Sequence, residues 1–192
     1  MTAYKFLATG ALGPLSGFAW PVPIGEAPGP WVEADGPLAV GARGTHVCRP
    51  TDLAHWLHNE LWEIEVAGDT LEGPDCLVVR RARLVRRIAA WSAGGAERFA
   101  RACIAHGAAE GDGAMAGVGR ATSSDVAAFL DDAAQALASG YPAIAAFCAA
   151  MAVSRSGGAG RADGEAADTD GAESAYRRER AWQSAWIARE LL

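Results

Sequence analysis

The sequence predicts an α+β protein in which a small N-terminal β-sheet with one short helix is followed by a C-terminal helical bundle. Up to residue 88, short apolar runs alternate with Gly and Pro, and residues 61–66 alternate with a period of two. From residue 92 the apolar spacing becomes helical. We therefore expect a sheet-containing region at 1–88, a helical region at 89–154, a flexible acidic linker at 155–172 and a docked C-terminal helix at 173–192.

The first expected strand covers residues 4–8, and the Gly- and Pro-rich segment after it predicts a loop. Trp20 and Trp31 flank this loop. They either line a ligand pocket or anchor the loop in the core, and anchoring is the more common role of such rings.

Thr51 is a suitable N-cap for a short helix over residues 52–59, with Leu53 and Trp56 facing the core and His55 and His58 sharing the opposite face. A strand over 61–66 follows, with Glu63 and Glu65 on its solvent side. Glycines at 68 and 73 predict the next turn region, and residues 76–88 predict a long or bent strand.

The helical region begins with a helix that we expect to end at Gly107. A second helix starts near Thr122 and stops at Gly140, and a third starts at Pro142. We expect the third helix to turn its larger apolar side chains inward; these are Ile144, Phe147, Cys148 and Met151. The last helix carries Trp182 and Trp186 on one face, and this pair predicts docking on the bundle.

Composition excludes several classes of protein. A net charge of −6 and a pI near 5.2 argue against nucleic-acid binding, and the arginine-rich run at 80–87 is better explained as a strand with solvated side chains than as an anion site. No leader-like segment is expected at the N-terminus, and the longest apolar run, 143–153, is too short to span a membrane. The four cysteines form no Cys-x-x-Cys pair and predict free thiols in a cytoplasmic protein.

Three of the four histidines cluster with a cysteine, which makes His46, Cys48, His55 and His58 the candidate catalytic residues. Imidazole and thiolate are zinc ligands, but the spacing fits no standard zinc site, and we predict no tightly bound metal and no cofactor. His46 with Cys48 as base and nucleophile is a further alternative. Asp131 and Asp132 are expected on a solvated helix face. The candidate ligand-binding residues are Trp20, Trp31 and Arg49.

Residues 44–50, the short helix and the strand at 61–68 resemble an uncharacterised bacterial and phage domain with a Gly-x-His-x-Cys core, over roughly residues 1–88. A more distant likeness is to ADP-ribosyltransferases, with His46 where they have an aromatic residue. That resemblance implies an NAD-binding scaffold. The strand at 4–7 has no Arg or His, and the strand at 76–88 has no Glu, where that family has catalytic residues.

The leading functional hypothesis is a non-catalytic binding or interaction protein that recognises a protein or small molecule and could form homo-oligomers through the C-terminal helix. The alternative is an enzyme centred on the histidine cluster. Convergence of His46, Cys48, His55 and His58 in one concave pocket would favour the enzyme, and their dispersal would favour the binding protein.

Overall fold

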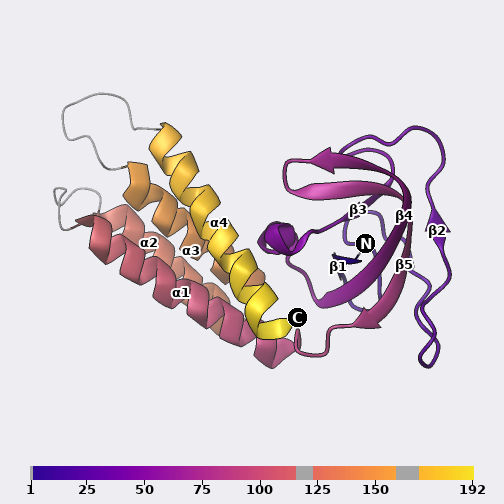
Figure 1. Ribbon diagram of the computed structural model, residues 1–192. Coiled ribbons are helices and arrows are strands. Elements are labelled where there is room, and N and C mark those ends of the chain that lie inside the picture. The colour runs from indigo at the N-terminus through magenta and orange to yellow at the C-terminus, as the bar shows by residue number, and fades with distance from the viewer. Residues whose placement is uncertain (1, 116–122, 159–168) are drawn as a thin grey trace. The chain divides into compact units, whose positions relative to one another are not determined.

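The computed structural model describes residues 2–115, 123–158 and 169–192. An N-terminal antiparallel sheet is followed by helices, so the predicted α+β class is confirmed (Figure 1). The chain forms two compact units, one of Met1–Ser92 with Ile187–Leu192 and one of Ala93–Trp186. Among the described residues, no helix has both the length and the apolar character needed to cross a membrane.

The sheet of the first unit is built around a long curved hairpin (Figure 1). Its strands are β1 (Thr2–Leu7), β2 (Val32–Glu33), β3 (Thr45–Val47), β4 (Glu60–Gly73) and β5 (Cys76–Arg87). β4 pairs with β1 on one side and β5 on the other, and β5 also pairs with β2 and β3. Two backbone hydrogen bonds between Tyr4 and Cys48, of 2.9 and 2.7 Å, join the end of β3 to β1. The strands β1, β4, β5 and β3 therefore form a closed ring.

Alternation along these strands sends one set of side chains into a shared hydrophobic core. Trp62, Ile64 and Val66 of β4 point into it, as the period of two predicts. The other buried members are Ala3, Leu7, Ala11, Trp20, Val47, Leu77, Val79, Ala82 and Leu84.

The 3-10 helix η1 (Pro50–Trp56) differs from the short helix expected here. Its N-cap is Arg49 and not Thr51, because the side chain of Asp52 accepts a hydrogen bond from the Arg49 backbone. Leu53 is fully buried, but the prediction of a core position for Trp56 is wrong, since that residue is 36% exposed. Its indole Nε1 instead donates to the Asp75 carbonyl at 2.6 Å, which places the ring over the β4–β5 turn.

Strand β4 continues well past the expected turn at Gly68. The pairing of β4 with β5 shifts between Ala67 and Thr70, so the extra residues are absorbed as an irregularity and the strand resumes. The turn itself lies between Gly73 and Cys76.

Gly44 is the position of the first unit that most requires glycine. Its φ is +113°, and an added Cβ would lie 2.4 Å from Val78 and 2.9 Å from Leu38. We expect Gly44→Ala to lower the free energy of unfolding by about 1–3 kcal/mol, through backbone strain and overpacking. Urea denaturation measures this loss. Gly17→Ala is the matched control, because Gly17 also has a positive φ but an added Cβ meets nothing within 4 Å. Equal losses in the two variants would contradict the packing part of the explanation.

The helices of the second part of the chain are α1 (Ala93–Met115), α2 (Ser123–Ala138), α3 (Pro142–Gly158) and α4 (Thr169–Leu191). α3 begins at Pro142, as predicted, but α1 does not end at Gly107. At Gly107 an added Cβ would lie 3.2 Å from the Ala149 carbonyl oxygen, so this glycine permits close approach of α1 to α3 and does not terminate a helix.

The expected inward stripe of α3 is also wrong in part. Ile144 and Phe147 are 52% and 46% exposed. The buried face consists mainly of alanines, because small side chains let α3 lie close to its neighbours; they are Ala145, Ala146, Ala149, Ala150 and Ala152.

Both ends of the expected linker at 155–172 are helical, since α3 continues to Gly158 and α4 starts at Thr169. The remainder of that expectation, residues 159–168, lies outside the described residues. α4 contacts α1 and α3: the rings of Trp186 and Phe99 are 5.5 Å apart, and the Ser154 hydroxyl donates to the Ala172 carbonyl.

Candidate functional site

The candidate catalytic side chains have separate partners. The Nε2 atom of His46 accepts a hydrogen bond from the Gly41 backbone N–H at 2.8 Å. His55 Nε2 lies 3.7 Å from an oxygen of Asp75, and the Nδ1 atom of His58 accepts from the Asn59 backbone. No group of three or more His, Cys, Asp or Glu side chains within the described ranges is arranged to hold a metal ion. The structure does not bring the histidine cluster together as one site.

The surroundings of His46 and Cys48 do not suit a base and a nucleophile, because the Nε2 lone pair of His46 already accepts a hydrogen bond and the Cys48 thiol stays protonated. Burial, followed by the positive charge of Lys5, lowers the pKa of His46, so its imidazole is neutral at pH 7 and its Nε2 lone pair is already engaged by Gly41. Burial raises the pKa of Cys48 to about 12, which keeps the thiol protonated. This pair is therefore not activated for nucleophilic attack.

Lys5 is a charged residue on the core-facing side of β1, next to His46. It shares a strand face with the core residues Ala3 and Leu7, and its Nζ donates to the His46 carbonyl at 2.5 Å and lies 5.5 Å from the centre of the Trp20 ring. Burial lowers the pKa of Lys5 to about 8. Its role here is to tie β1 to β3 at the position where their backbones are not bonded to one another.

We expect His46→Ala to lower the free energy of unfolding by about 0.5–1 kcal/mol, because the hydrogen bond that closes the turn from Gly41 to His46 is lost. Thermal and urea denaturation measure this effect. His58→Ala is the matched control, since the hydrogen bond of its imidazole goes to the backbone of the next residue, Asn59, and closes no turn. If His46→Ala left the stability unchanged, His46 would have no structural role and its assignment as a loop anchor would be wrong.

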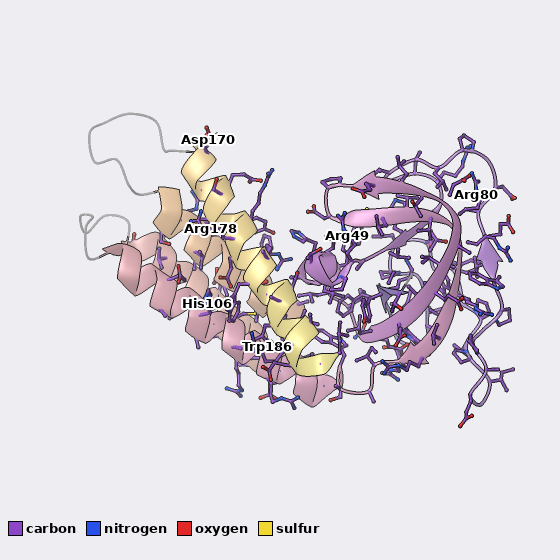
Figure 2. All side chains as sticks on the ribbon, in the orientation of Figure 1. Arg49, Arg80, His106, Asp170, Arg178 and Trp186 are labelled. Carbon is purple, nitrogen blue, oxygen red and sulfur yellow. The ribbon has the colours of Figure 1, made fainter. Side chains whose placement is uncertain are left out.

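The candidate ligand-binding residues also make contacts within the protein. Trp20 is buried in the core. The centre of the Trp31 ring lies 4.9 Å from the guanidinium carbon of Arg81 and 4.5 Å from that of Arg83. Arg49, at the start of η1 (Figure 2), bonds to Asp52 at 2.6 Å and donates to the Gly73 carbonyl at 3.3 Å.

The arginine run of β5 is matched by acidic side chains. Arg83 and Arg86 pair with Glu65 and Glu63 on the neighbouring strand at 2.6 and 2.7 Å. These pairs neutralise charge that an anion site would need to keep available. They explain why an acidic protein carries so basic a strand.

The loop of residues 8–31, which we call the apolar loop, has a well-defined backbone. The buried carboxylate of Glu60 accepts hydrogen bonds from the Gly10 and Ala11 N–H groups at 3.1 and 3.2 Å, and from the Trp62 indole at 3.0 Å. Further backbone bonds join Ala8 to Leu12, Gly13 to Phe18, Ala11 to Trp20 and Gly29 to Leu84. Sequence reasoning missed this anchor, because Glu60 lies about fifty positions from Gly10 and Ala11.

The apolar loop nevertheless exposes large hydrophobic side chains. Leu15 is 95% exposed and Ile24 is 84% exposed. Leu12, Phe18 and Val22 are also exposed. Five large apolar side chains are therefore exposed within this one hydrogen-bonded loop.

A second polar cluster lies in the helical unit, where His106 of α1 meets α4 (Figure 2). His106 Nδ1 is 2.7 Å from a carboxylate oxygen of Glu179, and the Trp182 ring stacks on the imidazole at 3.8 Å. Gln183 donates to Glu179 at 3.1 Å and to the Ala146 carbonyl at 3.0 Å. Burial raises the pKa of Glu179, and His106 and Gln183 oppose the rise.

The sequence contained a usable signal for this cluster. His106 occurs on the apolar face of its helix, and Glu179 and Gln183 are four residues apart beside Trp182. The cluster joins three helices, so we assign it a structural role.

A shallow hollow of about 640 Å³ lies between α1 and α2. Its lining is mostly apolar, with Glu97 and Arg101 paired to each other at 2.7 Å. Neither the histidine cluster nor His106 contributes to it. No protein-family model, curated protein or solved structure matches the chain.

Proposed function

We propose that the chain is a non-catalytic protein-binding module whose apolar loop docks on an apolar surface of a partner protein. The observation that carries the proposal is the exposure of Leu15 and Ile24 on a backbone fixed by hydrogen bonds. A loop that is already ordered loses little conformational entropy on binding, so apolar burial contributes more fully to affinity. The free thiols fit a cytoplasmic location.

The enzyme alternative receives less support from the same geometry. An active site around His46, Cys48, His55 and His58 would need these side chains to share a pocket, and they have separate partners. An NAD-binding scaffold of the ADP-ribosyltransferase type remains a hypothesis that rests on the sequence resemblance.

The proposal is tested with the double variant Leu15→Ser, Ile24→Ser in affinity purification from the source cells. We expect the wild type to retain a partner at near-stoichiometric amounts and the double variant to lose it, with unchanged thermal stability. Ile144→Ser is the matched control, because Ile144 is an exposed apolar residue on α3. Retention of the same partner by the double variant, or its loss in the Ile144→Ser control, would contradict binding through the apolar loop.

A further inference from the structure

Cys48 and Cys76 are the residues next to Val47 and Leu77, the last pair of the β3–β5 ladder. The register pairs His46 with Val78 and Val47 with Leu77, so its next step places Cys48 against Cys76. Val47 and Leu77 point into the core of the ring. Because successive side chains alternate, both thiols project from the other face of the sheet, on the same side as each other.

The backbone bonds identify the type of pair that the two cysteines form. In an antiparallel strand, the N–H and C=O groups of one residue point to the same side. Both groups of Cys48 bond to Tyr4 of β1, so they point away from β5. One further step of this register would make Cys48 and Cys76 a non-hydrogen-bonded pair, the type in which Cα atoms are about 4.5 Å apart and side chains are closest. That separation falls within the range of about 4.4–6.8 Å found in disulfides.

We propose that Cys48 and Cys76 form a single intramolecular disulfide when the protein meets a peroxide. One thiolate attacks hydrogen peroxide and becomes a sulfenic acid as hydroxide leaves. The second thiol then attacks that sulfur, the S–S bond forms and water leaves. In total, two thiols and one hydrogen peroxide give one disulfide and two waters. The bond joins the end of β3 to the start of the β5 strand.

The surroundings of the thiols set the rate of this reaction. Both cysteines are 3% exposed, and burial raises the pKa of both, while the charge of Lys5 opposes the rise. Since the thiolate is the reacting form, oxidation is slow at neutral pH and accelerates as the pH rises, by up to about tenfold per unit. The reaction is expected under sustained oxidation.

The test uses the full-length protein, treated with hydrogen peroxide and blocked with an alkylating agent. A glutamate-specific protease cuts between the two cysteines, so a disulfide holds two separate peptides together until it is reduced. We expect one linked pair, containing Cys48 and Cys76, and a protein mass, measured before alkylation, lower by two hydrogen atoms. The Cys103→Ser, Cys148→Ser double variant should give the same result, whereas Cys76→Ser should give no link.

Mapping the wild-type protein identifies the partners even if a variant does not fold. Linkage of either cysteine to Cys103 or Cys148, linkage between two chains, or conversion to sulfinic acid without any link would overturn the proposal. An unchanged mass after prolonged oxidation at raised pH would also overturn it.

Discussion

Replacing Glu60 by alanine is expected to lower the free energy of unfolding by about 3–5 kcal/mol. The carboxylate is buried and accepts hydrogen bonds from Gly10, Ala11 and Trp62. Without it, three donors lose their acceptor, and each unsatisfied buried group costs about 1–3 kcal/mol. Urea denaturation monitored by tryptophan fluorescence measures the loss.

Glu72→Ala is the matched control for this variant, because Glu72 is on the same strand, is 82% exposed and lies 3.8 Å from Arg49. Its effect should stay within about 0.5 kcal/mol. A similarly small effect for Glu60→Ala would show that the apolar loop does not depend on this anchor.

The same carboxylate predicts a pH dependence. Burial acts to raise the pKa of Glu60, but hydrogen bonds from Trp62, Gly10 and Ala11 and the charge of Arg87 together lower it. A lowered pKa in the folded state means that ionised Glu60 stabilises the fold above its unfolded pKa of about 4.3. That stability is lost as the pH falls through the folded-state pKa. The difference between wild type and Glu60→Gln should therefore be smaller at pH ~3 than at pH ~7, and a constant difference would contradict the lowered pKa.

Replacing Glu179 by alanine is expected to destabilise the helical unit by about 2–4 kcal/mol, because two hydrogen-bonding partners of a buried carboxyl group lose it and each unsatisfied buried group costs about 1–3 kcal/mol. The change removes the hydrogen-bonding partner of His106, on which the Trp182 ring stacks, and the acceptor of the Gln183 amide. Denaturation followed by far-UV circular dichroism measures the loss of helix.

Glu173→Ala on the same helix is the control. Glu173 pairs with Arg177 at 2.7 Å on the solvent side, where a single ion pair contributes about 0.3–0.5 kcal/mol. Glu179→Gln should recover part of the stability, because its amide oxygen can still accept one hydrogen bond. If Glu173→Ala were as damaging as Glu179→Ala, burial would not explain the effect.

The local sequence pattern correctly predicted those helices and strands that are determined by neighbouring residues. The alternation at Trp62, Ile64 and Val66 identified β4, and Pro142 marked the start of α3. The pattern failed where contact with a segment distant in the sequence determines the position of a residue. Gly107 looked like a helix stop, but its lack of a side chain serves contact with Ala149 of another helix. Trp56 fitted a core position, but its indole bonds to the turn at Asp75.

The candidate site was predicted less well for the same reason. Clustering of His46, His55 and His58 in sequence gave no information about where each ring points, and each has a different partner. The Gly- and Pro-rich segment after β1 was predicted as a loop, with Trp20 either in a pocket or in the core. In the structure Trp20 is buried in the core, and Leu15 and Ile24 of the same loop are exposed. The anchor at Glu60 depends on a long-range contact that no local pattern encodes.

The alanine face of α3 reverses the usual relation between residue size and sensitivity to mutation. Gly107 faces Ala149, and an added Cβ at Gly157 would meet Ala175 of α4 at 2.4 Å, so these helices touch through the smallest side chains. Larger residues on this seam would force the helices apart, whereas Ile144 and Phe147 face outward. In a complete substitution map, this unit would therefore tolerate the loss of large side chains from α3 better than the gain of a single methyl group on its alanines. The alanines and glycines along these helix contacts therefore limit which sequences the bundle can accept.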